Sequence, residues 1–106
     1  MSSNILVLTD NDFSDKLPDK PTIVDFWASW CGPCQALGPV LEELSVELSD
    51  KWLFAKINVD ENSETASKFR IRSIPCLILF KDKAEVGRLV GYKDKKELVL
   101  ELESYL

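Results

Sequence analysis

The chain is short, acidic and of ordinary globular composition. Its 106 residues are 45% apolar and 29% charged, with 13 basic and 18 acidic side chains and a formal net charge of -5. This size and composition predict one compact domain spanning residues 1–106, not a disordered or fibrous chain. A negative surface repels phosphate groups, so neither nucleic acid nor a membrane is expected as a partner.

The beginning of the sequence resembles neither a secretory signal nor a membrane anchor. No basic stretch precedes its apolar run, which covers only residues 5–8, and the longest apolar run, residues 74–80, is interrupted by Pro75. Both runs are too short for a signal core or a bilayer span. We therefore expect a soluble, cytoplasmic monomer, although a transit peptide removed during maturation would leave no trace here.

Histidine is absent from the sequence, and cysteine occurs three times. Without imidazole, the Ser-His-Asp and Cys-His routes to nucleophilic catalysis are excluded, and zinc loses its usual nitrogen ligands. Three cysteines are too few for a disulfide-stapled scaffold, and the odd number argues against purely structural pairing. Chemistry must therefore come from thiols, carboxylates, lysines and the backbone.

Several short apolar runs have the length and composition of β-strands. The run at 22–27 is apolar on both faces except for Asp25, which is typical of a central parallel strand. The last two runs are separated by a short polar stretch, which predicts an antiparallel hairpin. The predicted strands are residues 5–8, 22–27, 53–59, 76–80 and 85–90.

Other segments have the period of amphipathic helices. The longest begins at Pro33 and contains Pro39, which should kink it because proline supplies no amide hydrogen. The predicted N-caps of the remaining helices are Thr9 or Asp10, Asn62, and Asp94. The side chains that the helices are expected to bury are Phe13, Leu17, Leu37, Leu41, Leu44, Leu48, Ala66, Phe69, Leu98, Leu102 and Tyr105.

Strands and helices alternate along the chain until the final hairpin and a last helix. Helical crossovers between the first three strands imply that these strands are parallel. The sequence therefore predicts an α/β fold in which a central mixed sheet has helices on both sides.

Cys31 and Cys34 lie in the sequence Trp-Cys-Gly-Pro-Cys, between a buried strand and the start of a helix. The unpaired amides and partial positive charge of a helix N-terminus favour the thiolate of Cys31, which is the nucleophilic form in disulfide exchange. The short spacing lets Cys34 attack a mixed disulfide on Cys31 and release the reduced client. Pro33 suits the first helical turn. The motif predicts dithiol–disulfide chemistry.

Two other interpretations of this motif are a zinc half-site and a pair of unrelated buried cysteines. Zinc requires four tetrahedral ligands, whereas one chain offers three sulfurs and no imidazole. A site shared between two chains stays open, but it would be strained. Redox chemistry is favoured because the motif and its strand–helix context agree.

Asp25 and Lys56 are charged residues within apolar predicted strands. Burial should raise the pKa of the carboxyl, whereas a nearby ammonium would lower it. The residues alone therefore do not determine the direction of the net pKa shift. A structural aspartate that is satisfied by a neighbour explains this pattern equally well.

The segment from Phe26 to Cys34, Phe-Trp-Ala-Ser-Trp-Cys-Gly-Pro-Cys, resembles the signature of the thioredoxin family. The likeness continues, in the family's order and spacing, through Leu8-Thr-Asp, Lys56–Asp60, Ile71–Pro75, Gly91 and the final helix. It implies a thioredoxin fold, in which four helices flank a five-stranded sheet with the strands in the order first, third, second, fourth and fifth. It also implies a protein-disulfide reductase that serves electron transport and cell redox homeostasis.

The resemblance assigns roles to individual residues. It implies that an exposed Cys31 attacks the client disulfide and that a shielded Cys34 resolves the mixed disulfide. Asp25 would lie behind this pair and exchange a proton with Cys34 through water, with Lys56 close to Asp25.

A client-binding rim around Cys31 is implied as well. The Ile74–Pro75 bond is expected to be cis, which leaves the Ile74 backbone free to pair with an extended client, although the sequence alone favours a trans proline at the start of a strand. Phe26 and Trp27 are more typical of core than of contact surface. The residues of the implied rim are Trp30, Gly32, Pro33, Ile74, Pro75, Val90 and Gly91.

The residues between the two cysteines bear on the redox poise. Gly32 and Pro33 resemble the pair found in reducing members of the family, whereas oxidants and isomerases of the same fold usually carry a histidine there. The resemblance therefore favours a reductant.

Two positions depart from the family pattern. Cys76 stands where threonine is more usual; a small residue that fits the strand is the simpler interpretation, and an extra oxidisable thiol near the cysteine pair is the alternative. Asp82 and Lys83 replace the usual Asn-Gly of the hairpin, so mild strain or a different turn type is expected.

The sequence has no nucleotide-binding motif and no predicted metal site, so NADPH and FAD would act only through a partner. The resemblance implies a thioredoxin reductase as that partner, with a ferredoxin-linked donor as the alternative, and clients such as reductive enzymes and peroxidases. Two other functions stay open: an oxidase or isomerase of the same fold, and a structural subunit whose role would survive Cys31→Ser and Cys34→Ser.

Overall fold

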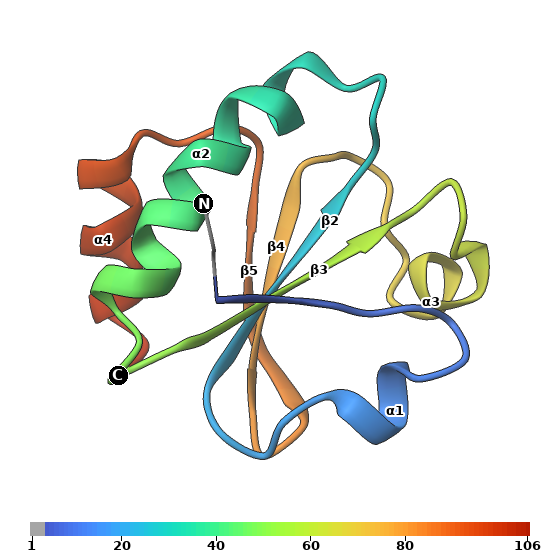
Figure 1. Ribbon diagram of the computed structural model, residues 1–106, viewed down its shortest axis with the longest axis horizontal. Helices are drawn as coiled ribbons and strands as arrows, with labels where there is room; N and C mark the ends of the chain where they lie inside the picture. The colour runs from blue at the N-terminus through green and yellow to red at the C-terminus, as the bar shows by residue number, and fades with distance from the viewer. Residues whose placement is uncertain (1–3) are drawn as a thin grey trace.

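A central sheet with helices on both faces forms the computed structural model, which describes residues 4–106 (Figure 1). Strands and helices follow one another in the order that the sequence predicts. They are β1 (Ile5–Val7), α1 (Phe13–Lys16), β2 (Thr22–Trp27), α2 (Gly32–Glu47), β3 (Leu53–Asn58), α3 (Ser63–Lys68), β4 (Cys76–Lys81), β5 (Ala84–Val90) and α4 (Lys95–Glu103).

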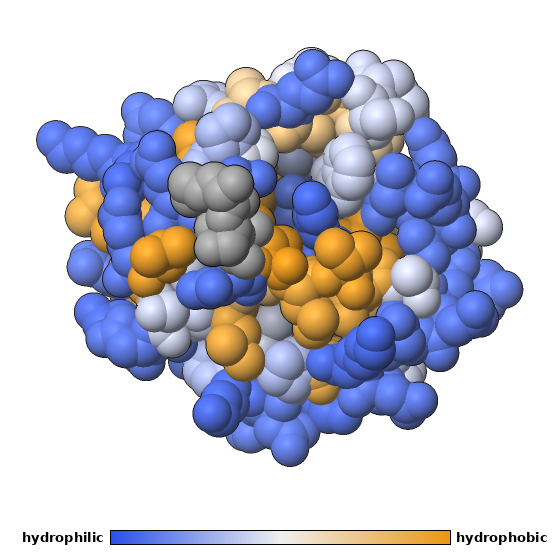
Figure 2. All heavy atoms as spheres, in the orientation of Figure 1, coloured by the Kyte–Doolittle hydropathy of each residue, from blue (hydrophilic) through white to orange (hydrophobic). Residues whose placement is uncertain are grey.

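The five strands lie in the order β1-β3-β2-β4-β5. β3 pairs in parallel with both β1 and β2, whereas β4 runs antiparallel to β2 and to β5. The predicted strand order and the mixed character of the sheet are thus confirmed. β1 forms one edge of the sheet, and its Leu6 and Val7 are exposed. Figure 2 shows that apolar side chains gather in a patch on the face of the molecule on which β1 lies in front in Figure 1.

Two apolar clusters fill the space between the sheet and its helices. On one face, Ile23 packs with Leu37, Leu41 and Leu44 of α2 and with α4. On the other face, Phe26 and its strand neighbours pack against α1 and the half-buried ring of Phe69. Because side chains alternate along a strand, Asp25 points to the same face as Ile23, toward α2.

Helix α2 runs from Gly32 to Glu47 without interruption and contains Pro39. Its predicted apolar face is confirmed at Leu37, Leu41 and Leu44, while Leu48 is the half-buried C-cap residue that packs against the same cluster. α4 begins as predicted, because the Asp94 side chain accepts a hydrogen bond from the Glu97 amide at 2.8 Å. These contacts attach α2 and α4 to one face of the sheet.

The predicted cap of α1 is wrong. The N-cap residue is Asp12, whose carboxylate accepts a hydrogen bond from the Thr9 amide at 2.7 Å, and the helix covers a single turn. The Asp10 carboxylate does not cap α1, because it accepts hydrogen bonds from amides of α3. Phe13 and Leu17 are buried as expected, because the turn holds both against the sheet.

Asp10 caps α3 from a distant part of the chain. Its carboxylate accepts hydrogen bonds from the Glu64 and Thr65 amides at 3.2 and 2.8 Å, which lowers the pKa of Asp10. Asn62 occupies the N-cap position without capping, since its side-chain oxygen accepts from the Asp10 amide instead. The predicted cap of α3 is therefore wrong as well, and its buried side chain is Thr65, while Ala66 and Phe69 are half-buried. A tertiary contact has replaced the local one.

The hairpin between β4 and β5 turns through two residues in the left-handed region, Asp82 with φ 52° and Lys83 with φ 66°. A type I′ turn requires positive φ at both positions, so the turn keeps the geometry that Asn-Gly usually supplies. The Lys83 ammonium donates a hydrogen bond to the Ser14 carbonyl at 3.2 Å. The expectation of mild strain therefore applies to Lys83, because a lysine Cβ is crowded in this conformation.

We predict that Lys83→Gly raises the free energy of unfolding by about 1 kcal/mol, because glycine adopts positive φ without steric cost. Urea unfolding of the two proteins measures the difference. Lys83→Ala is the matched control: it removes the contact with Ser14 but keeps the left-handed Cβ, so it should gain nothing. Equal stability of the glycine and alanine variants would contradict the assignment of strain.

Candidate active site

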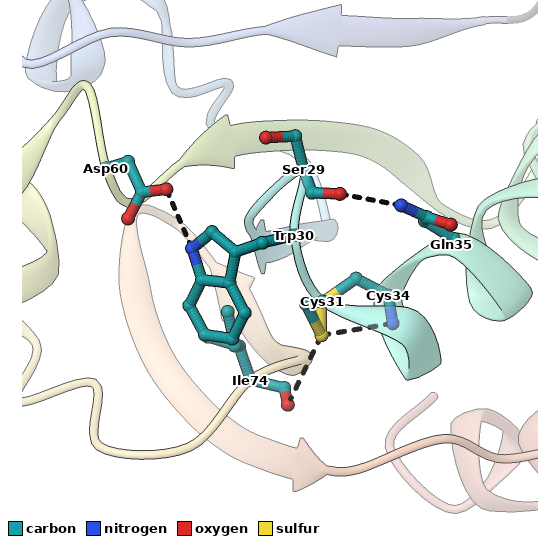
Figure 3. Close-up of a disulfide and its surroundings, with 7 residues drawn as sticks. All are labelled: Ser29, Trp30, Cys31, Cys34, Gln35, Asp60 and Ile74. Atoms are coloured by element: carbon teal, nitrogen blue, oxygen red, sulfur yellow. Dashed lines mark hydrogen bonds between the residues drawn. A yellow bond between two sulfur atoms is a disulfide. The ribbon is translucent and has the colours of Figure 1, made fainter.

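The sulfur of Cys31 caps the N-terminus of α2 (Figure 3). The Cys34 amide donates a hydrogen bond to the Cys31 sulfur at 3.2 Å, and the Ile74 carbonyl oxygen lies 3.8 Å from the same sulfur. Side-chain oxygens usually occupy this capping position, which faces unpaired amides and the positive end of the helix dipole. The first turn of α2 contains no acidic residue, whose negative charge would disfavour a thiolate at Cys31.

A disulfide joins Cys31 to Cys34, whose Cα atoms are 5.2 Å apart. Both cysteines are only 4% exposed, so the expectation of an exposed Cys31 beside a shielded Cys34 is wrong for the oxidised form. The physical reason is that the bridge holds both sulfurs in one apolar cluster with Ala28, against Trp27 and Ile74.

Asp25 is a buried carboxyl without a local partner. It is 6% exposed, and its Oδ1 has no hydrogen-bond partner among residues 4–106. Desolvation raises the pKa of Asp25 to about 7, although the positive charge of Lys56 opposes the rise. Burial is thus the larger of the two effects that the sequence alone could not rank.

A cavity of about 40 Å³ lies beside Asp25, and Lys56, Gly38 and Glu42 contribute to its lining. This volume is sufficient for a water molecule with polar partners. Lys56 is the register neighbour of Asp25 on β3, yet its ammonium lies 5.5 Å from the centre of the Trp27 ring. Asp25 and Lys56 thus both line the cavity, although the Lys56 ammonium contacts Trp27.

The residues of the implied rim differ in their exposure. Trp30 is 69% and Val90 52% exposed, Gly32 and Pro33 are exposed, and Ile74 and Gly91 are half-buried. The Ile74–Pro75 bond is cis, and the Gly91 amide donates a hydrogen bond to the Pro75 carbonyl at 2.8 Å.

Pro75 is buried, so the prediction that it forms part of an exposed rim is wrong. Of the apolar residues named for the rim, Trp30 and Val90 are the most exposed, whereas half-buried Ile74 packs against the cysteine cluster.

Two residues of the site carry no clear signal in the sequence. Asp60 accepts a hydrogen bond from the Trp30 indole at 2.8 Å and so fixes that exposed ring (Figure 3). Two hints were available: its position after a parallel strand, at the sheet edge where such sites collect, and its place in the segment Lys56–Asp60 that resembles the family. Trp27, assigned to the core by its apolar neighbours, contacts both the cysteine cluster and Lys56.

Cys76 is free and buried, and it packs with Phe26 on the sheet face opposite Asp25. Burial raises the pKa of the Cys76 thiol, while the nearby Arg88 guanidinium lowers it to a smaller extent. A buried thiol with a raised pKa is a poor nucleophile. The structure favours the interpretation of Cys76 as a small residue that fits its strand.

Two kinds of feature are missing from the part of the chain that the structure describes. Residues 4–106 contain no cluster of three or more side chains suited to hold a metal ion. None of the described helices is long and apolar enough to cross a membrane.

A disulfide at the N-terminus of a helix that follows the central strand of such a sheet defines a dithiol–disulfide oxidoreductase. The thioredoxin family model matches residues 4–104. The thioredoxin of Alicyclobacillus acidocaldarius is 51% identical over 102 residues, covering 95% of this chain and 97% of that protein. The thioredoxins of Staphylococcus saprophyticus and Staphylococcus epidermidis are each 45% identical over 102 residues, covering 96% of this chain and 98% of theirs.

The chain belongs to the thioredoxin family. Its redox centre is the Cys31–Cys34 pair, and membership of the family implies two general kinds of partner, a reductase and disulfide-containing clients.

We predict that Asp25→Asn stabilises the fold at pH 8 by roughly 2–4 kcal/mol and has little effect below pH 4. The folded protein holds the Asp25 proton up to about pH 7, whereas the unfolded chain releases it near 3.8. Between these values the folded state binds more protons, so its stability falls as pH rises. The Asp25→Asn variant has no carboxyl at this position, so its stability does not fall with pH for this reason.

Urea unfolding at half-unit pH intervals measures the difference between the two proteins. Asp50→Asn, at an exposed position, is the control and should show no such trend. A constant difference between wild type and Asp25→Asn from pH 4 to 8 would contradict the raised pKa.

Proposed function

We propose that the protein is a cytoplasmic protein-disulfide reductase, which keeps client proteins reduced and passes electrons to reductive enzymes. The observation that carries the proposal is the hydrogen bond from the Cys34 amide to the Cys31 sulfur at the start of α2. A thiolate in this position is stabilised by the helix before any client arrives.

The exchange takes place in two steps. The Cys31 thiolate attacks one sulfur of a client disulfide; that disulfide breaks, the other client sulfur leaves as a thiolate, and a mixed disulfide forms. Cys34 then loses its proton and attacks the Cys31 sulfur, the mixed disulfide breaks, and the second client sulfur leaves. The client gains two electrons and two protons in total, and the Cys31–Cys34 disulfide remains.

Asp25 is proposed as the group that accepts the Cys34 proton through water in the adjacent cavity. A base works best when its pKa lies near the working pH, and Asp25 has a pKa of about 7. Its free Oδ1 and the cavity beside it support this role.

The exposed apolar side chains around the disulfide are proposed to bind clients. Trp30, held by Asp60, and Val90 are exposed apolar residues, and apolar contact makes few demands on the client sequence. The electrons that reduce the disulfide would come from a thioredoxin reductase, which supplies NADPH and FAD; a ferredoxin-linked donor is the alternative.

The direction of electron flow is tested by equilibrating the Cys31–Cys34 disulfide with glutathione buffers. We expect a reduction potential of about −270 mV, the value characteristic of thioredoxins as a class. Pro33→His, which introduces the residue typical of oxidants, should raise the potential by about 30 mV or more, a tenfold change in the equilibrium. A wild-type value near the about −120 mV of strong oxidants would favour the oxidase or isomerase instead.

We predict that Asp25→Asn slows the reduction of insulin by about tenfold or more near pH 7 and by much less at pH 9. At high pH the Cys34 thiol ionises without help, so the base is no longer needed. Turnover with a chemical reductant as electron source, followed across this pH range, provides the measurement.

Glu42→Gln is the matched control for this experiment, because it neutralises a carboxylate at the same cavity in an exposed position. Its turnover should stay close to that of wild type. Unchanged turnover of Asp25→Asn at every pH would remove Asp25 from the mechanism.

A further inference from the structure

Lys56 and Asp25 are neighbours that do not pair. They stand opposite each other in the parallel register of β2 and β3, on the same face of the sheet, and both line one cavity. An ion pair between them would satisfy a buried carboxylate. Instead, Asp25 Oδ1 has no hydrogen-bond partner in the described chain, and the Lys56 ammonium lies over an aromatic ring.

That ring belongs to Trp27, which stands two residues after Asp25 on β2 and therefore shares its face. The Lys56 ammonium is 5.5 Å from the ring centre, within the range of a cation–π contact. Half-buried Trp27 also packs against the cluster of Ala28, Cys31 and Cys34, which contains the redox centre. The Trp27 side chain thus contacts both the cluster that contains the disulfide and the ammonium of Lys56.

We propose that Trp27 is a positioning residue whose ring holds the Lys56 ammonium back from Asp25, so that the carboxyl stays unpaired and available to exchange a proton with Cys34. The proposal rests on the function proposed above for Asp25. It assigns to Trp27 a part in the proton step besides its place in the core.

The consequence of losing the ring follows from the charges around Asp25. The titratable groups near Asp25 are Glu42 from α2 and Lys56 from β3, which line the same cavity, and the Cys76 thiol of β4, which lies on the opposite face of the sheet. Of these, Lys56 is the group whose charge lowers the pKa of Asp25. A lysine released from Trp27 would close on the carboxylate and keep it ionised at neutral pH.

The test is a double-mutant cycle on the oxidised protein, in which the Asp25 pKa is measured by NMR titration of its carboxyl carbon. We expect Trp27→Leu to lower the Asp25 pKa by about 1 to 3 pH units, as a newly formed ion pair would. Trp27→Phe keeps an aromatic face and should lower it by less than Trp27→Leu. In a Lys56→Met background, Trp27→Leu should leave the pKa unchanged.

Two outcomes of the cycle overturn the proposal. An unchanged or higher pKa in Trp27→Leu would mean that the ring does not restrain Lys56. A fall that persists in the Lys56→Met background would mean that the smaller side chain admits water to Asp25 and acts without the lysine.

A measurement on the wild-type protein keeps the proposal falsifiable if Trp27→Leu does not fold. The protons on the Lys56 carbon next to the ammonium should resonate upfield because of the Trp27 ring current, and an ordinary random-coil shift would overturn the proposal. Since neither readout depends on activity, a positive result together with unchanged turnover of Asp25→Asn would reject only the catalytic role of Asp25.

Discussion

One hydrogen bond, from the Cys34 amide to the Cys31 sulfur, joins the fold to its chemistry. It exists because α2 begins directly after the loop that leaves the central strand, so that a cysteine takes the place of an ordinary capping residue. The rest of the molecule serves to hold this helix end in place. Apolar residues of α2 attach it to the sheet, and the loop before Pro75 covers the sulfur from the other side.

The second constraint is the burial of a carboxyl in the strand that supports the helix. Asp25 occupies a position that an apolar side chain would fill at lower free energy, and desolvation keeps its proton bound up to about pH 7. The fold is thus less stable near neutral pH than it would be without this residue. Such a conflict between stability and local environment is common at functional sites.

Much of this fold could be predicted from the apolar pattern, because strands such as β2 and the buried face of α2 depend on local periodicity. Contacts between distant segments could not. Asp10 lies next to α1 in sequence, yet it caps α3, since two amides of α3 lie beside it in space. The motif at Cys31 and Cys34 identified the redox centre, but the burial of both sulfurs depends on the packing of Trp27 and Ile74.

The carboxylate of Asp10 has a consequence for how the molecule opens. α3 has six residues, too few for an isolated helix to persist in water, and its first amides depend on a side chain from before α1. Fraying of α3 must therefore break contacts with the N-terminal third of the chain, and movement there must uncap α3. The Asp10 carboxylate therefore couples the opening of α3 to the opening of the segment before α1.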